Sequence, residues 1–221
     1  MFAVAIDGPA GAGKSTIART AAAGLGFIYI DTGALYRTIG LACLNRNISF
    51  SYKENVISVL NQIKIELKFI DGEQRMFLDD ADVSNEIRTE NVSMSASVVS
   101  AIPEVRAFLL ELQRGFAKTN DVIMDGRDIG TVVLPDADVK IFLTASPESR
   151  AKRRTIQLKE KGINGDYDTI LADIIKRDNN DTNREIAPLK AADDAVTVDT
   201  TELTLEQSIN AVISVIKEKM K

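Results

Sequence analysis

The chain has 221 residues, of which 45% are apolar and 27% are charged, values typical of a globular protein near single-domain length. The 27 Lys and Arg residues stand against 32 Asp and Glu, and the net charge of -5 argues against a nucleic acid partner. With no histidine and one cysteine, the sequence excludes Ser–His and Cys–His nucleophilic pairs, zinc sites built from His or Cys clusters and a disulfide framework.

The N-terminus has no signal-peptide pattern, and no apolar stretch approaches the ~18 residues of a membrane-spanning helix. We therefore expect a cytoplasmic protein that has no membrane partner.

Five short apolar runs predict the strands of a parallel sheet. The runs do not alternate with polar residues, which is typical of strands covered on both faces, and amphipathic helical stretches lie between most of them. We predict an α/β fold, a five-stranded parallel sheet flanked by helices. The predicted strands are 3–6, 27–30, 122–124, 139–143 and 195–198.

Helix starts are predicted where a capping residue, a proline or an acid precedes an amphipathic stretch. Ser146 offers an N-cap to a helix that opens with Pro147 and Glu148, and Gly162 offers a stop. Similar starts lie at 103–104 and 204–206.

Residues 63–83 depart from the α/β pattern. Here alternating apolar residues flank the turn pair Asp71-Gly72, and residues 79–82 mark another turn, a pattern that predicts antiparallel strands. We expect a small antiparallel insertion between the second and third core strands.

The sequence at 8–15, GPAGAGKS, matches the phosphate-loop pattern between a predicted strand and a helix that runs to about Gly24. Small residues allow backbone N–H groups to surround phosphates, Lys14 reaches the outer phosphates, and Ser15 offers its hydroxyl to Mg²⁺. A glycine-rich turn without a ligand is the less favoured alternative. The expected ATP-binding residues are Gly8, Pro9, Ala10, Gly11, Ala12, Gly13, Lys14, Ser15 and Thr16.

A nucleoside triphosphate site is compatible with kinases and with switch or motor NTPases. The chain has no Asn-Lys-x-Asp element of a guanine-specific switch after a core strand, and its scattered arginines favour a second, phosphorylated substrate.

Asp125 ends the apolar run 122–124, where ligands bind in open α/β sheets, so it is a second candidate for organising Mg²⁺. The alternative is a strand-end aspartate that caps the Asp-Gly turn.

Two groups of charged residues share helical faces by their spacing. One group is Arg150, Arg153 and Arg154, whose positive charges would repel one another unless they bind an anion. The alternative is a solvated basic helix face. The other group, Arg177, Asp181 and Arg184, has a surface ion-pair ladder as its alternative.

Several segments closely resemble the bacterial cytidylate kinases, and the resemblance covers nearly the whole chain. They are DTGALYR at 31–37, SNEIRT at 84–89, DGRDIGTVV at 125–133, KIFL at 140–143 and RDNNDTNR at 177–184. Thr32 stands where many relatives carry Ser, and Ser15 where some carry Gly; both departures keep or add a hydroxyl.

The resemblance implies transfer of the γ-phosphoryl group of ATP to CMP or dCMP with Mg²⁺, by a monomer. It implies a single P-loop kinase domain, 1–221. Within it, the core would be 1–33, 120–145 and 190–221, the acceptor-binding region 34–119 with the insertion at about 63–83, and the lid region 146–189.

The resemblance also implies roles for individual residues. Arg37 and Arg127 would hold the acceptor phosphate, with Thr32 among the substrate-binding residues, and Arg177 and Asp181 would hold the ribose. The cytosine edge would contact Ser97, Arg106, Asp128 and Arg184. The catalytic set would be Lys14, Arg127, Arg150, Arg153 and Arg154, with Ser15 and Asp125 at the metal.

Two alternatives remain open from the residues themselves. One is a P-loop kinase for a different nucleoside monophosphate, and the other is a non-kinase NTPase or switch. The Arg177, Asp181 and Arg184 spacing and the insertion favour a cytidylate kinase over the first alternative.

Overall fold

The computed structural model describes residues 1–160 and 162–220. The chain forms two compact units. Residues Ile30–Lys118 make up the insert unit, and Met1–Tyr29 with the residues from Thr119 onward make up the core unit.

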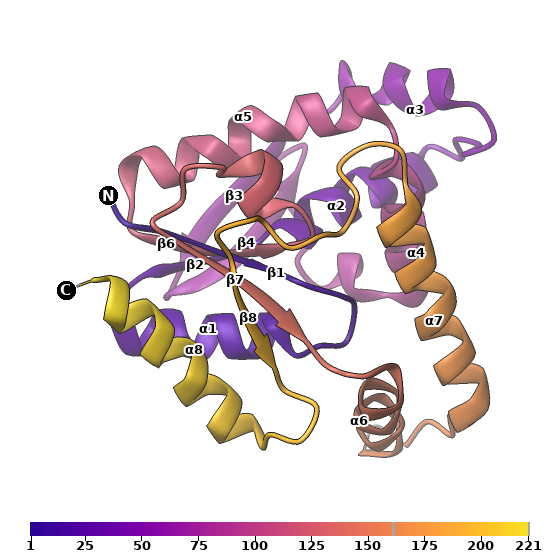
Figure 1. Ribbon diagram of the computed structural model, residues 1–221. Helices are drawn as coiled ribbons and strands as arrows, with labels where there is room; N and C mark the ends of the chain where they lie inside the picture. The colour runs from indigo at the N-terminus through magenta and orange to yellow at the C-terminus, as the bar shows by residue number, and fades with distance from the viewer. Residues whose placement is uncertain (161, 221) are drawn as a thin grey trace. The chain divides into compact units, whose positions relative to one another are not determined.

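A parallel sheet with strand order β2-β6-β1-β7-β8 runs through the core unit (Figure 1). β1 pairs with β6 on one side and with β7 on the other, and β7 pairs with β8. The predicted five-stranded parallel sheet is confirmed, since each strand overlaps one of the predicted apolar runs. The strands are β1 (Ala3–Asp7), β2 (Ile28–Asp31), which lies at the boundary of the two units, β6 (Val122–Gly126), β7 (Val139–Thr144) and β8 (Val196–Asp199).

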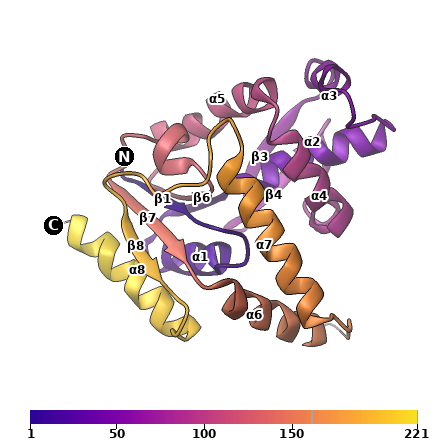
Figure 2. The same ribbon diagram turned by 45° about the vertical axis from the view of Figure 1, so that its right-hand side comes forward.

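Helices α1 (Lys14–Leu25) and α8 (Leu205–Lys219) cover one face of this sheet (Figure 1). Ile17 and Ala21 of α1, and Val212 of α8, join the strand residues Val4 and Ile141 in one buried apolar cluster. Helix α6 (Pro147–Glu160) packs against α7 (Tyr167–Asn183), as Figure 2 shows. A π-helical turn, η2 (Ile129–Val133), follows β6.

The predicted helix starts are confirmed, each by a local hydrogen bond or by proline. Ser146 Oγ accepts the N–H of Ser149 at 3.1 Å at the start of α6. Thr204 and Gln207 form a reciprocal capping box at α8. Helix α5 (Pro103–Thr119) begins at Pro103 itself.

The insert unit contains the predicted antiparallel sheet, in the order β3-β4-β5. The two-residue turn Asp71-Gly72 has φ of 53° and 78°, as a tight hairpin requires. The expectation of a turn over 79–82 was wrong at its end, because Ala81 and Asp82 pair with β4 as a strand and only Asp79 and Asp80 turn. The unit comprises α2 (Thr32–Asn45), α3 (Lys53–Leu60), β3 (Ile65–Ile70), β4 (Glu73–Leu78), β5 (Ala81–Asp82), the 3₁₀ turn η1 (Glu86–Arg88), α4 (Glu90–Val99) and α5.

Helices α2 and α4 approach closely at Gly40. A Cβ atom at this position would lie 3.0 Å from Ser95 Cβ and 3.2 Å from the backbone nitrogen of Ala96. Glycine at this position therefore lets the two helices pack closely. The lower helix propensity of glycine is a cost of this close contact.

Within the described residues, no single helix is long and apolar enough to span a membrane. Helices α4 and α5 pass that test only as a pair, and the chain bends by 102° between them.

The close approach of α2 and α4 predicts opposite effects for one substitution at two helical glycines. Gly40→Ala should lower the free energy of unfolding by about 1–3 kcal/mol, the usual effect of overpacking. Gly24→Ala in α1, where nothing lies within 4 Å of the added Cβ, should raise the free energy of unfolding by about 0.5–1 kcal/mol. Urea denaturation measures both, and a stabilising Gly40→Ala would contradict the tight helix contact.

Candidate functional site

The phosphate loop lies between β1 and α1, as predicted. Gly8 has φ of 151°, and a Cβ there would lie 1.9 Å from the carbonyl oxygen of Leu143, so no other residue fits without moving the strand beside it. Lys14 begins α1 and is buried, and its Nζ donates to the carbonyl oxygen of Pro9 at 2.8 Å. The lysine thus lies across its own loop, the position from which an ammonium group can contact bound phosphates.

Burial, followed by the positive charge of Arg127, lowers the pKa of Lys14 to about 7, whereas Asp125 and Asp7 oppose the shift. A phosphate group beside Lys14 would favour the charged ammonium and raise this pKa. The electrostatics of the loop therefore favour an anionic ligand.

Ser15 and Asp125 lie side by side, as expected of two residues proposed for one metal ion. Ser15 Oγ donates to Asp125 Oδ2 at 2.9 Å, and the hydroxyl of Tyr29 donates to Asp125 Oδ1 at 3.1 Å. The carboxylate of Asp125 is buried at the end of β6. Sequence reasoning missed Tyr29, because no local pattern indicates that a strand tyrosine reaches a residue 96 positions away.

Asp7 is a second buried carboxylate at the end of the neighbouring strand. Its Oδ1 accepts the backbone N–H of Ile129 and its Oδ2 that of Gly130, both at 2.8 Å. Burial raises the pKa of Asp7 to about 6, although these two hydrogen bonds act to lower it. Sequence reasoning missed this residue as well; the only signal was an acid at the end of an apolar strand.

Two ion pairs join the loop after β6 to the end of α7. Arg127 Nε donates to Asp181 Oδ2 at 2.8 Å, and Arg184 Nη2 lies 3.5 Å from Asp128 Oδ1. Asp128 and Asp181 are both buried. Asp181 and Arg184 thus pair with Arg127 and Asp128 of the DGRD segment. These two pairs are not the surface ion-pair ladder that was the alternative prediction.

The three arginines of α6 face different surroundings. Arg150 is 3% exposed, and it donates to both carboxylate oxygens of Asp178, at 3.0 and 2.5 Å, and to the carbonyl oxygen of Ala10 in the phosphate loop at 3.0 Å. Arg153 donates to the backbone oxygen and side chain of Thr200, and Arg154 is exposed. A single basic face is therefore not present, because protein groups bind two of the three guanidinium groups.

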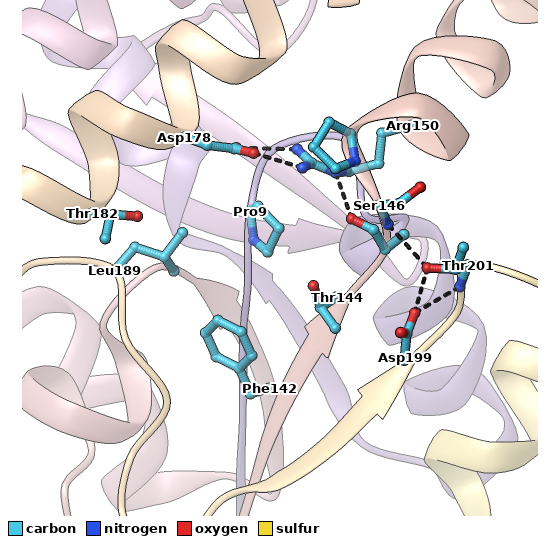
Figure 3. Close-up of a pocket in the computed structure, with 12 residues that line it drawn as sticks. Pro9, Phe142, Thr144, Ser146, Arg150, Asp178, Thr182, Leu189, Asp199 and Thr201 are labelled. Carbon is cyan, nitrogen blue, oxygen red and sulfur yellow. Dashed lines mark hydrogen bonds and ion pairs between the residues drawn. The ribbon is translucent and has the colours of Figure 1, made fainter.

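A cavity of about 380 Å³ opens beside the phosphate loop (Figure 3). Thr182 and Leu189 lie on one side of the labelled residues, Asp199 and Thr201 lie on the other, and the Arg150–Asp178 pair lies along the top of the view. Sequence reasoning missed Asp178, although it adjoins Arg177. The cavity is lined by Pro9, Phe142, Thr144, Ala145, Ser146, Pro147, Arg150, Asp178, Thr182, Leu189, Asp199 and Thr201.

The insert unit contains the other predicted substrate-binding residues. Thr32 is buried at the start of α2, and Arg37 pairs with Asp31, the N-cap of that helix, at 2.6 Å. The Arg106 guanidinium lies 5.9 Å from the ring centre of Tyr36. Ser97 is half-buried on α4.

Gln74 of β4 ties the antiparallel sheet to the start of α2. Its Oε1 accepts the backbone N–H of Asp31 at 2.8 Å, and its Nε2 donates to the carbonyl oxygen of Asp31 at 3.3 Å. The insertion thereby fixes the backbone that precedes Thr32.

The parallel sheet, the phosphate loop and the lysine that crosses it define the class: this chain is a P-loop nucleotide-binding protein of the α/β type. Sequence comparison identifies the family within this class.

A family model described as cytidylate kinase matches residues 4–218. Proteins named cytidylate kinase are similar over nearly their whole length: one from Caldicellulosiruptor saccharolyticus is 54% identical over 95% of this chain and 93% of its own. One from Caldicellulosiruptor bescii is 51% identical over 99% and 96%, and one from Lactobacillus johnsonii is 48% identical over 100% and 96%. The chain belongs to the cytidylate kinase family and is a phosphotransferase.

Among solved structures, a shikimate kinase from Bacteroides thetaiotaomicron aligns over 98% of each chain with 13% identity and a TM-score of 0.49. The family assignment rests on the sequence relatives alone.

The raised pKa of Asp7 predicts a pH dependence of folding. At pH values between the ordinary pKa of 3.8 and about 6, the folded protein retains a proton on Asp7 that the unfolded chain has released. The contribution of Asp7 to the free energy of unfolding is therefore lost as the pH rises from 3.8 through about 6. Between pH 5 and pH 7, the free energy of unfolding of the wild type should fall by about 1 kcal/mol relative to that of Asp7→Asn, measured by urea denaturation.

Asp166→Asn is the matched control for this measurement. Hydrogen bonds from the side chain and backbone of Thr169 lower the pKa of Asp166, so it is ionised in both states between pH 5 and pH 7. The difference in the free energy of unfolding between Asp166→Asn and the wild type should stay constant from pH 5 to pH 7. A constant difference for Asp7→Asn as well would contradict the raised pKa of Asp7.

Proposed function

We propose that this protein transfers the γ-phosphoryl group of ATP to CMP and dCMP, which yields ADP with CDP or dCDP. Membership of the cytidylate kinase family over residues 4–218 is the observation that carries the proposal. The buried Lys14 across the phosphate loop supports it, since it is placed to hold the donor phosphates.

The donor would bind with its phosphates in the loop formed by residues 8–16. The cavity of Figure 3 begins at Pro9 of that loop, so we place the nucleoside end of ATP there. Arg150 contacts the same loop through the carbonyl oxygen of Ala10, which supports its assignment to the transferring phosphoryl group. Arg153 and Arg154, one turn further along α6, would act with it from the lid region 146–189.

The residues present fit Mg²⁺. Ser15 Oγ and Asp125 Oδ2, 2.9 Å apart, are hard oxygen ligands of the kind that Mg²⁺ prefers, so these two residues would hold the ion. When bound, the ion supplies charge neutralisation at the outer phosphates of the donor.

The acceptor would bind through the residues assigned to it by family resemblance. Arg37 and Arg127 would hold its phosphate, with Thr32 also among the substrate-binding residues, and residues 34–119 would form the acceptor-binding region. The ribose would contact Arg177 and Asp181. Ser97, Arg106, Asp128 and Arg184 would contact the cytosine edge.

The reaction needs no general base, which fits a sequence without histidine. The attacking oxygen belongs to the acceptor phosphate, whose second pKa is about 6, so it is largely ionised at neutral pH. This oxygen forms a bond to the γ-phosphorus of ATP as the bond to the β,γ-bridging oxygen breaks, and ADP leaves. The protein supplies alignment and positive charge through Lys14, Arg127 and the α6 arginines.

The proposed function predicts ADP release that depends on the acceptor. With MgATP and CMP, dCMP, UMP, AMP or GMP in parallel assays, ADP should form rapidly with CMP and dCMP only. Preference for AMP or GMP would indicate a kinase for another nucleotide, and release without acceptor would indicate an NTPase of another kind. Either result would overturn the proposal.

The proposed base contact of Asp128 predicts a change of specificity. In Asp128→Asn, the ratio of kcat/KM for CMP over UMP should fall by about tenfold or more, because a site built to bind one base edge loses a charged hydrogen bond. The control is Asp194→Asn, which removes an exposed partner of Lys140 and should leave the ratio unchanged. An unchanged ratio in Asp128→Asn would withdraw Asp128 from the base site.

A further inference from the structure

The turn η2 follows Asp128, and its first backbone donors are satisfied in an uncommon way. An aspartate at the N-cap position ordinarily folds its own carboxylate back onto the N–H of the second or third residue of the turn, here Gly130 or Thr131. Asp128 occupies the N-cap of η2 and makes no such side-chain hydrogen bond. Instead, the N–H groups of Ile129 and Gly130 donate to Asp7, which lies more than 120 positions earlier in the chain.

The Asp128 carboxylate lies close to an arginine, while Asp7 accepts two N–H groups of η2. Asp7 accepts both of these donors, and Oδ1 of Asp128 lies 3.5 Å from Nη2 of Arg184. Asp128 and Arg184 are two of the residues proposed to contact the acceptor base. Asp7, at the end of β1, therefore contacts the turn that follows one of these residues.

The charge on Asp7 argues against a purely structural role. The carboxylate is 4% exposed, and its burial disfavours the ionised form even though two N–H groups bind it. A neutral side chain of the same shape would avoid that desolvation. The burial of ionised Asp7 is unfavourable for folding, yet its carboxylate accepts two hydrogen bonds from η2. Such a cost is typical of a residue that holds a functional site in a particular geometry.

We propose that Asp7 is a positioning residue for base recognition, since it caps η2 in place of Asp128 and keeps the Asp128 carboxylate directed at Arg184. The inference rests on the proposed function, because it concerns the acceptor site of that same reaction. Asp7 acts through Asp128 and does not itself contact the substrate.

The test compares Asp7→Asn with the wild type. An amide oxygen can accept only one of the two N–H groups, and its NH₂ would oppose the other, so Asp128 would turn back to cap η2. We expect the KM for CMP to rise about tenfold and the CMP over UMP preference to fall, as for loss of one charge-assisted hydrogen bond. The KM for CMP should rise by a larger factor than the KM for ATP, although Lys14 also loses the nearby negative charge of Asp7. The thermal unfolding midpoint at pH 7 should not decrease.

The double variant Asp7→Asn with Asp128→Asn separates action through Asp128 from independent action. If Asp7 works through Asp128, the double variant should match Asp128→Asn alone. Additive losses would overturn the proposal. A KM for ATP that rises by a larger factor than the KM for CMP would also overturn it, since it would place the main role of Asp7 at Lys14, and so would a lower unfolding midpoint with an unchanged KM for CMP.

Two controls keep the outcome clear. Ser208→Ala removes a buried hydroxyl that donates to the backbone oxygen of Thr204, the N-cap of α8, and it should lower the unfolding midpoint without changing the KM for CMP. A wild type that does not use CMP would refute the proposed function. A wild type that uses CMP, beside an Asp7→Asn variant with wild-type KM and preference, would refute only this inference.

Hydrogen exchange provides a second measurement should Asp7→Asn fail to fold. The amides of Ile129 and Gly130 should be equally protected in the wild type and in Asp128→Asn, because Asp7 accepts both. Loss of their protection in Asp128→Asn would mean that Asp128 caps its own turn, and the inference would be wrong.

Discussion

The burial of charged groups at the carboxyl ends of β1 and β6 is the constraint on which the core unit depends. Burial disfavours the charged form of Lys14, whereas Asp125 and, less strongly, Asp7 favour it. Strand register places these groups, since Ile6 pairs with Asp125 and Asp7 with Gly126. A slip of one residue would turn the Asp7 side chain to the opposite face of the sheet, away from η2.

Arginine charges in the same unit are compensated in the same manner. Asp178 binds Arg150 with both oxygens, and Asp181 binds Arg127. Without these carboxylates, the arginine side chains would be free to change orientation. The ion pairs hold Arg150 beside the phosphate loop and Arg127 after β6 in fixed orientations. An anionic substrate therefore meets donors that are already oriented, which lowers the entropy lost on binding.

The fold could be predicted from the sequence because its signals are local. The apolar runs, the phosphate loop and the capping residues Ser146 and Thr204 each act over a few positions, and the antiparallel hairpin follows from Asp71-Gly72. Many of the candidate site residues were predicted through family resemblance, and their roles stay predictions. Asp7, Tyr29, Gln74 and Asp178 were missed because their partners lie 28 to 123 positions away, and only the folded chain brings them together.

The Arg127–Asp181 pair raises the question of whether an acceptor phosphate must displace a carboxylate. Arg127 uses Nε toward Asp181 and Nη1 toward the carbonyl oxygen of Gly126. Its guanidinium carries five donors in a rigid fork, so these contacts fix its plane and leave further N–H groups for a phosphate. Asp181 accepts through Oδ2, and its other oxygen can accept from a ribose hydroxyl. Under the proposed function, the pair would orient both side chains for the acceptor without having to be broken.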